Sequence, residues 1–345
     1  MQKGFIGITI ILLAVSAGSG LVTVPEPLRI GSFMIREYEE ETEFTTAQQY
    51  SQMSIVGDVM LARHVEKYLN VYGSDYVYSQ LPTLASTTIL LGNFEASIPE
   101  VHIPTPANTF RFSVDTVHIP ALAAYGFSHM SLANNHTFDS GRDGFQNLQT
   151  VLSETGITHM GSPILSSTSV TYIEIQDVTV AVLALYALDQ SPEKELMDEV
   201  LHEASDKSDY LFVYVHWGTE YDPVHSLFQE TLAHELIDGG ADAIFGHHPH
   251  VVQDIELYNG ALIFYSLGNF IFDQYFSKEV QEGLQVNVSF DNEVPVYSLN
   301  GVSSIGSRSA PRLMRGYEQN MFLTELARKS SRELSEGILN GEVKK

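Results

Sequence analysis

The chain has 345 residues, which is enough for one large domain or two domains of ordinary size. It carries 18 Lys and Arg against 43 Asp and Glu, so the formal net charge is −25 at pH 7. Such an acidic chain repels phosphate backbones, and we expect no nucleic-acid partner. The absence of cysteine excludes disulfides and thiolate chemistry. Any metal must therefore bind through His, Asp, Glu or Asn, which are donors that suit Mn, Zn or Fe.

The first residues have the pattern of an export signal. Lys3 precedes an apolar run over residues 5–17, and small residues follow this run. A membrane span needs about 20 residues, so the run is short, although it can be extended to Val24. Residues 1–24 are therefore predicted to be either a cleaved signal peptide or a membrane anchor; a buried N-terminal strand is the alternative. We expect an extracytoplasmic protein, either secreted or anchored by this segment.

Three further regions follow along the chain. Residues 25–50 are acidic and lack periodicity, which is typical of a linker. A folded domain is expected over residues 51–290. The pattern weakens after Phe290, and residues 291–345 are predicted to form a C-terminal extension. Its final part, residues 312–345, is expected to pack loosely or not at all. Residues 320–334 are the helical candidate within that extension.

Short apolar strands alternate with helical stretches within the predicted domain. The expected strands cover residues 54–57, 88–91, 128–132, 210–215 and 241–245. The expected helices cover residues 63–69, 145–154 and 228–237. Hairpins are expected over residues 172–185 and 255–265, and the Asn259-Gly260 pair is a strong turn signal for the second. This alternation, interrupted by hairpins, predicts an α/β fold, a four-layer αββα sandwich with two mixed sheets.

Polar side chains stand where the expected strands end. They are Asp58, Asn93, Glu95, Asn134 to His136, His216, His248 and His250. In open α/β sheets, binding sites form at the carboxyl ends of the strands. We therefore expect these nitrogen and oxygen donors to converge on divalent metal. Two alternatives are that Asp58 caps the following helix and that His216 is an ordinary core residue.

A series of motifs resembles a known family. The motifs are Gly57-Asp58-Val59-Met60-Leu61, Asn93-Phe94-Glu95, Ala133-Asn134-Asn135-His136-Thr137-Phe138-Asp139-Ser140-Gly141, His216-Trp217-Gly218-Thr219-Glu220-Tyr221, Gly246-His247-His248-Pro249-His250-Val251 and Ser266-Leu267-Gly268-Asn269-Phe270. Their order over residues 53–275 is similar to that of the CapA or PgsA-type capsule (poly-γ-glutamate) synthesis family, a relative of the calcineurin-like metallophosphoesterases. The resemblance implies the metallophosphoesterase-like form of the αββα fold.

The resemblance also implies roles for individual residues. The implied metal ligands are Asp58, Glu95, Asn135, His216, His248 and His250. His136 is implied as the acid or charge stabiliser, and Asp139 as the residue that orients it. Arg63 and Arg111 are scarce cations that could hold an anionic substrate.

The sequence departs from the related phosphoesterases at Met60, which stands where their Asp-x-His motif has histidine. A thioether is a poor ligand for a hard divalent ion. We therefore expect one tight metal site and a weaker second one.

The resemblance implies capsule or poly-γ-glutamate biosynthesis. We expect either a metal-dependent hydrolase or transferase acting on a cell-envelope polymer or phosphoester, or a non-catalytic assembly, export or anchoring factor. Expected partners are an anionic polymer such as poly-γ-glutamate and other membrane-bound capsule-synthesis proteins. Whether the protein is an enzyme stays open at this point.

Several neighbouring residues have less specific patterns. His247 is expected to be polar filler, and Trp217 is expected to pack in the core rather than stack on substrate. Asn269 and Asp273 either close the floor of the site or form a turn.

Overall fold

The computed structural model describes residues 50–106, 109–188 and 190–344. The predicted signal peptide or anchor, residues 1–24, lies outside the described residues, and so does the predicted acidic linker, apart from Tyr50. Among the helices that are described, none is long and apolar enough to cross a membrane.

The first sheet is mixed. Its strand order is β14-β13-β12-β1-β2-β3-β4, with β11 paired to β1 and β15 paired to β13. Its strands are β1 (Gln52–Val59), β2 (Thr88–Phe94), β3 (Phe127–Ser131), β4 (Thr158–Met160), β11 (Asn269–Ile271), β12 (Glu282–Asp291), β13 (Val294–Ser303), β14 (Arg312–Leu313) and β15 (Glu342–Lys344). Strands β1 to β4 run parallel to one another, and β12 runs antiparallel to β1.

The second sheet is also mixed and has the order β5-β6-β7-β8-β10-β9. Its strands are β5 (Val170–Ile175), β6 (Val178–Ala187), β7 (Tyr210–Trp217), β8 (Ala243–His247), β9 (Ile255–Tyr258) and β10 (Ala261–Phe264). Strands β6, β7 and β8 are parallel, and the two predicted hairpins form its edges. Asn259 and Gly260, at φ 48° and 82°, make the tight turn between β9 and β10 that their sequence predicts.

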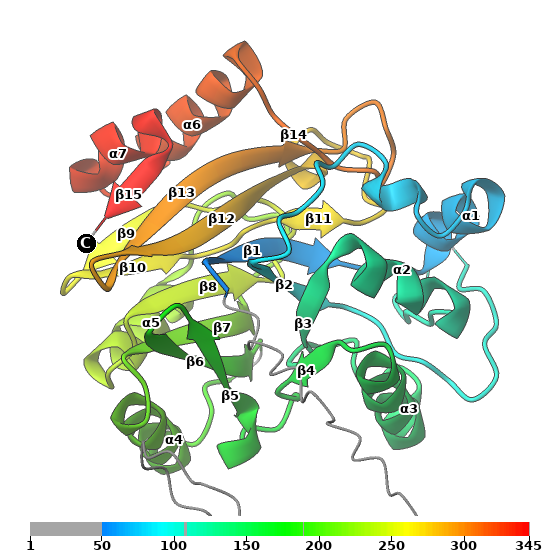
Figure 1. Cartoon of the computed structure of the whole chain (residues 1–345), viewed down its shortest axis with the longest axis horizontal. Helices are drawn as coiled ribbons and strands as arrows, with labels where there is room; N and C mark the ends of the chain where they lie inside the picture. The colour runs from blue at the N-terminus through cyan, green and yellow to red at the C-terminus, as the bar shows by residue number, and fades with distance from the viewer. Residues whose placement is uncertain (1–49, 107–108, 189, 345) are drawn as a thin grey trace, which may run out of the picture. The chain divides into compact units, whose positions relative to one another are not determined.

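Helices cover the outer faces of both sheets (Figure 1). Helices α1 (Arg63–Tyr72), α2 (Ile119–Tyr125) and α3 (Gly141–Glu154) share an apolar cluster with the first sheet. Helices α4 (Lys194–Asp206) and α5 (Leu227–Asp238) share another with the second. The predicted αββα sandwich with two mixed sheets is therefore confirmed. The predicted helices near residues 63, 145 and 228 correspond to α1, α3 and α5, whereas α4 was not predicted.

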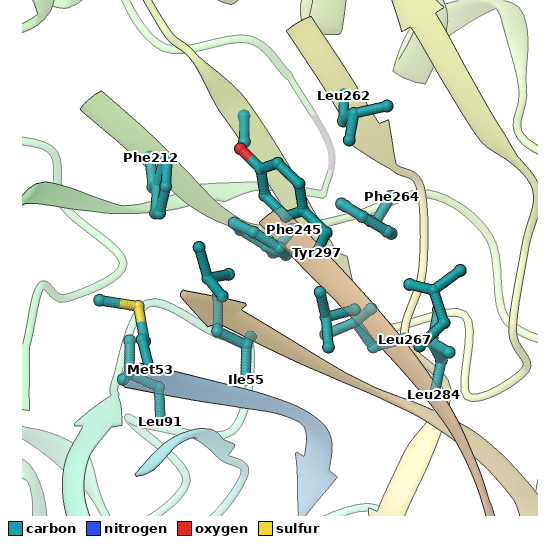
Figure 2. Packing of buried hydrophobic residues seen from close by; sticks show 14 of the residues in the cluster. Met53, Ile55, Leu91, Phe212, Phe245, Leu262, Phe264, Leu267, Leu284 and Tyr297 are labelled. Atoms are coloured by element: carbon teal, nitrogen blue, oxygen red, sulfur yellow. The ribbon is translucent and has the colours of Figure 1, made fainter. Parts of the chain in front are cut away.

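An apolar cluster fills the space between the two sheets (Figure 2). It includes Met53, Ile55, Leu91, Phe212, Phe245, Phe264 and Tyr297. Tyr214 of β7 adds a polar link, because its hydroxyl donates to the carbonyl oxygen of Val56 in β1 at 3.0 Å. This apolar interface fixes the two sheets relative to each other and hence the loops at their carboxyl ends.

The prediction that residues 312–345 pack loosely or not at all is wrong, and the C-terminal extension belongs to the folded domain. Strand β13 pairs with β12 along its whole length, and β15, which ends at Lys344, pairs with β13. Helices α6 (Tyr317–Lys329) and α7 (Ser335–Asn340) bury Leu326 and Ile338 in the same cluster that separates the sheets. Polar residues alternate with apolar ones in β13, which weakens the apolar signal in the sequence.

Truncating Leu326 tests this correction. Leu326 is 1% exposed, so Leu326→Ala should lower the free energy of unfolding by about 2–5 kcal/mol through lost burial and a cavity. Met321→Ala on the same helix is the matched control, because Met321 is 50% exposed and its truncation should cost less than about 1 kcal/mol. Urea-induced unfolding measures both. Equal, small effects would show that α6 does not belong to the cooperative unit.

Candidate metal centre

The candidate site lies where parallel strands of both sheets end. In the first sheet, Asp58 of β1 is in register with Asn93 of β2 and with Asn269 of β11. In the second sheet, His216 of β7 is in register with His247 of β8. Because neighbouring parallel strands present their carboxyl ends at one edge, this register lines up the polar side chains across each sheet.

The loops that leave these strands supply the remaining predicted ligands, which are Glu95, Asn135, His248 and His250. His248 and His250 have left-handed backbone conformations, at φ 96° and 58°. Such conformations are uncommon for residues with a side chain, and they are retained where the surroundings enforce them. One constraint is visible, since the Tyr221 amide donates to the carbonyl oxygen of Pro249 at 2.8 Å.

Two fully buried carboxylates, Asp58 and Glu95, form the centre of the site, and both are 0% exposed. The Asn93 Nδ2 group donates to Asp58 Oδ1 and to Glu95 Oε1, each at 2.9 Å. The same nitrogen lies 3.1 Å from His216 Nδ1. Asn134 orients this amide, because its own Nδ2 donates to Asn93 Oδ1. Asn93 is therefore the shared donor that lets the two carboxylates lie together.

Burial and charge shift the pKa values of the two carboxylates in opposite directions. Burial raises the pKa of Glu95 well above its ordinary value, and the neighbouring Asp58 charge raises it further. Burial also acts against ionisation of Asp58, but contacts with His247 and His250 hold the pKa of Asp58 well below its ordinary value. The two shifts have different causes, because histidines surround Asp58 whereas Glu95 has the Asp58 charge beside it.

Burial favours the neutral form of two imidazoles of the site, those of His216 and His248. Burial lowers the pKa of His216 well below its ordinary value. Burial, together with the nearby His250, lowers the pKa of His248 to about 3. The rings of His216 and His248 lie 4.8 Å apart between centroids. Neutral imidazole is the form that binds a metal ion, so both side chains are ready to act as ligands.

A chain of contacts leads from His216 to Asp139. His216 Nε2 lies 2.9 Å from Asn135 Oδ1, and Asn135 Nδ2 lies 3.2 Å from His136 Nε2. His136 Nδ1 lies 2.9 Å from Asp139 Oδ2. An ionised carboxylate only accepts, so His136 carries its hydrogen on Nδ1 and presents the lone pair of Nε2 toward the site. Phe112 stacks on the His136 ring, with 3.9 Å between centroids.

The neighbours of His250 define its tautomer. Asn269 donates through Nδ2 to Gln274 Oε1 and to the carbonyl oxygen of Val280, which identifies Asn269 Oδ1 as an acceptor. His250 Nδ1 lies 3.0 Å from that oxygen and must therefore carry the hydrogen. The lone pair of His250 then sits on Nε2, which lies 3.9 Å from Glu95 Oε2.

The donor set fits a metal ion. Within the part of the chain that the structure describes, four buried atoms of this site have no hydrogen-bond partner. They are Glu95 Oε2, His247 Nδ1, His247 Nε2 and His248 Nδ1. Each buried polar group left unpaired costs about 1–3 kcal/mol. Donor atoms of Asp58, Glu95 and His216 all lie within 4.8 Å of one another. Imidazole nitrogen and carboxylate oxygen are ligands that Zn, Mn and Fe accept.

The two arginines that the sequence predicts as substrate-binding residues differ in exposure. Arg63 is 9% exposed at its side chain, forms an ion pair with Asp273 and lies 4.6 Å above the Phe112 ring. Arg111 is exposed and donates from Nε to the carbonyl oxygen of Asp139 at 3.2 Å. Arg63 is thus part of the wall of the site, whereas Arg111 lies beside the His136–Asp139 pair within reach of solvent.

Met60 is buried in the apolar cluster beside α1. It is 0% exposed, and its sulfur accepts a hydrogen bond from the Ala62 amide at 2.9 Å. This position therefore supports the packing of the loop and offers no nitrogen or oxygen donor.

The structure also decides some of the alternatives. Helix α1 begins at Ala62 without a side-chain cap, and Asp273 Oδ2 accepts from the His64 amide at 3.2 Å, so a capping role for Asp58 is wrong. Trp217 is 0% exposed and donates to the carbonyl oxygen of Tyr265, which makes it a core residue.

The expectation that His247 is polar filler is wrong. His247 is 0% exposed, and its ring stacks on Tyr214 with 4.1 Å between ring centroids. Its Nδ1 lies 3.3 Å from Asp58 Oδ1 but forms no hydrogen bond with it.

Three residues that the structure places in or beside the site received no individual role from the sequence, although all three stand in the motifs quoted above. They are Asn93, Asn134 and Glu220. Asn93 and Asn134 are buried asparagines at strand ends, which was the available signal. Glu220 lies in the loop after β7, and its Oε1 is 4.0 Å from His250 Nε2. Its place in the motif His216-Trp217-Gly218-Thr219-Glu220-Tyr221 was the available signal.

Comparison with known proteins gives concordant family matches. A profile described as "Bacterial capsule synthesis protein PGA_cap" matches residues 52–274. The capsule biosynthesis protein CapA of Bacillus anthracis is 32% identical over 255 residues, which cover 67% of this chain and 62% of that protein. The PGA biosynthesis protein CapA of Bacillus subtilis (strain 168) is 28% identical over 296 residues, which cover 81% of this chain and 78% of that protein.

A solved structure gives a weaker match. The 5′-nucleotidase of Candida albicans SC5314 covers 70% of this chain and 48% of its own at 10% identity, with a TM-score of 0.37.

Replacing Asn93 tests its role as the shared donor. Asn93→Ala removes both hydrogen bonds to the carboxylates, and in a chelator it should lower the free energy of unfolding by about 2 kcal/mol or more. Saturating Mn²⁺ should reduce this loss, because a cation can hold the carboxylates together instead. The control is Asn320→Ala on α6, where the side chain is exposed. Urea unfolding of both variants with and without Mn²⁺ decides, and indistinguishable variants in chelator would refute the role.

Proposed function

The chain belongs to the PGA_cap family of bacterial capsule synthesis proteins, and we propose that it acts in capsule or poly-γ-glutamate biosynthesis as a metal-dependent hydrolase or transferase. Its substrate class would be a cell-envelope polymer or a phosphoester. The proposal extends to this chain the activity named for its CapA relatives, of which it matches 62% and 78% of the length.

One observation carries the proposal. Strand ends from two separate sheets bring Asp58, Glu95 and His216 together, with no part of their side chains more than 1% exposed. Burying two carboxylates beside neutral imidazoles is unfavourable unless a cation compensates. A folded protein that retains such a cluster at the carboxyl edge of its sheets has the properties of a metal-binding site rather than of a structural core.

Two sets of residues would hold metal. One ion would be held by Glu95, Asn135, His216 and His248. A second would share Glu95 and use Asp58 and His250. When bound, such ions supply a water of lowered pKa and neutralise negative charge on the substrate. With the ligands named so far, the first site has more donors than the second and should bind more tightly.

The His136–Asp139 pair is placed to move a proton. Asp139 Oδ2 accepts from His136 Nδ1 and so holds the ring with Nε2 toward Asn135 and the cluster. A protonated His136 would be stabilised by the Asp139 carboxylate and could donate from Nε2 to a leaving group, which is a general-acid role. Arg111, bound to the Asp139 carbonyl oxygen and exposed, would attract an anionic group at the same end of the site.

The net charge limits where an anionic polymer could bind to this protein. At −25, the protein as a whole repels polyanions such as poly-γ-glutamate. Binding would depend on the metal ions and on local cations such as Arg111. Other membrane-bound capsule-synthesis proteins are the second class of partner that we propose, because the relatives of this chain are named for capsule and PGA biosynthesis.

A non-catalytic assembly, export or anchoring role is the second candidate. Met60 favours it, because the histidine expected at this position is replaced by a side chain used only in packing. A protein with one depleted metal site could bind polymer without cleaving it.

Metal content and hydrolysis distinguish the two candidates. We expect the purified chain to retain divalent metal in elemental analysis and to hydrolyse a phosphoester or a γ-glutamyl polymer, with activity lost in chelator and restored by Mn²⁺ or Zn²⁺. His216→Ala should lower both metal content and activity by more than about tenfold, because it removes a buried ligand. The control is His202→Ala on α4, whose side chain is 80% exposed. Bound metal without hydrolysis of any substrate in the panel would favour the assembly role, and a chain without metal affinity would contradict both metal-based candidates.

We also propose that the protein is extracytoplasmic, secreted or anchored by residues 1–24. The support is Lys3 followed by the apolar run over residues 5–17. Fractionation of cells producing the full chain should recover it in the membrane or outside the cytoplasm, and replacing apolar residues of the run with Asp should retain it in the cytosol. Wild-type protein found in the cytosol would contradict the proposal.

A further inference from the structure

We infer that Glu220 is a ligand of the second metal ion and supplies the donor that Met60 fails to provide. The inference rests on the metal centre of the proposed function and adds a residue to it. Without Glu220, the second ion would have Asp58, Glu95 and His250 as protein ligands. Glu220 would make the set three carboxylates and one imidazole.

The first support is a group of acceptors that face one another. His250 Nε2 presents a lone pair, because Nδ1 of the same ring carries the hydrogen. This lone pair lies 3.9 Å from Glu95 Oε2 and 4.0 Å from Glu220 Oε1. Neighbouring ligands of an ion with bonds of about 2.1 Å lie roughly 3.0–3.4 Å apart, so a small rotation of a side chain closes the difference.

The second support is the buried oxygen at the centre of this group. Glu95 Oε2 is fully buried and has no hydrogen-bond partner among the residues that the structure describes. His250 Nε2, which presents a lone pair and is therefore also an acceptor, lies 3.9 Å from this oxygen. An acceptor facing an acceptor in a buried site is satisfied by a cation between them.

The third support is the way in which the Glu220 loop is held. Gly218, at φ 83°, turns the chain directly after β7, and a Cβ there would lie 2.8 Å from the Gln229 side chain. The amide of Tyr221 then donates to the carbonyl oxygen of Pro249, which directly precedes His250. Gln274 links the same loop to the site floor, since it donates to the Tyr221 hydroxyl and accepts from Asn269. Glu220 is therefore anchored through its neighbour beside His250.

The fourth support is accessibility. The Glu220 side chain is 38% exposed, whereas Asp58 and Glu95 are 0% exposed and His250 is 3% exposed at its side chain. A rim carboxylate can rotate to meet an arriving ion more easily than a residue enclosed between two sheets. Met60 cannot play this part, because its sulfur is bound to the Ala62 amide within the apolar cluster.

The ligand set has a consequence for metal choice. The first site would offer the imidazoles of His216 and His248, which suit Zn²⁺ well. The second would offer three carboxylates and a single imidazole, a harder set that suits Mn²⁺ better. We therefore expect the two sites to differ in metal preference and not only in affinity.

The test is a Mn²⁺ titration of the full chain. Binding is measured by calorimetry and by the loss of the electron paramagnetic resonance signal of free Mn²⁺. Wild type should bind two Mn²⁺ ions. Glu220→Gln keeps the size of the side chain and should weaken one of the two sites by more than about tenfold, with the other unchanged. Glu220→His should restore the weakened site and shift its preference from Mn²⁺ toward Zn²⁺.

Asp222→Asn is the matched control. Asp222 lies two residues further along the same exposed loop, and the substitution makes the same change in charge without removing a group that faces His250. It should leave both sites intact. If Asp222→Asn and Glu220→Gln weaken Mn²⁺ binding equally, the effect comes from the negative charge of the loop in general and not from a ligand. That result would overturn the inference.

The outcomes separate this inference from the proposed function. Two sites of wild-type affinity in Glu220→Gln, with hydrolysis still abolished by chelator, would overturn the inference and leave the proposed function standing. A single site in the wild type would overturn it as well. A wild-type chain that binds no Mn²⁺ or Zn²⁺ would overturn both.

Discussion

The structure depends on keeping Asp58 and Glu95 buried side by side. Two carboxylates removed from water repel each other and lose their hydration, so a core cannot contain them without compensation. The Asn93 amide gives each a hydrogen bond at 2.9 Å, and His250 Nδ1 approaches Asp58 Oδ2 to 3.1 Å. Glu95 Oε2 is left without a donor in the described chain. That remaining oxygen is the strongest physical reason to place a cation in the site.

Both sheets are needed to build this arrangement. Asp58 and Asn93 come from the first sheet, and His216 and His247 come from the second. Two glycines allow the final approach of the chain between them. A Cβ on Gly57 would lie 1.9 Å from the carbonyl oxygen of Gly268. A Cβ on Gly246 would lie 2.0 Å from the carbonyl oxygen of Tyr265. The segment between β10 and β11 can thus lie against β1 and β8 at once and bring Asn269 to His250.

The site is asymmetric from one end to the other. Around His136 the protein offers a hydrogen-bonded acid–base pair and a nearby exposed arginine. Around His250 it offers the rim carboxylate of Glu220. An anionic group would be attracted at the first end and repelled at the second unless a cation lies there. The strongly acidic surface makes this local arrangement decisive, because long-range electrostatics act against any polyanion.

The fold class and most of the site were predictable from local sequence patterns. Alternating strands and helices indicated the layered fold, and polar residues at strand ends indicated the edge at which they meet. Asn93 stood at such a strand end, but its role as a shared donor depends on a register between β1 and β2 that no local pattern encodes. The C-terminal segment was misjudged because β13 mixes polar and apolar residues, and its burial comes from pairing with β12 and packing against α6.

By itself, the sequence determined which residue types are available for chemistry: no thiols, many carboxylates, and histidines placed directly after apolar strands. These properties are local, so composition and spacing suffice to read them. Only the tertiary structure decided which of these side chains meet, which tautomer His250 adopts and that Glu220 faces it across 4.0 Å. Residues 58, 95, 216 and 250 are far apart along the chain, and their distances follow from sheet register and from the packing of two sheets on one core.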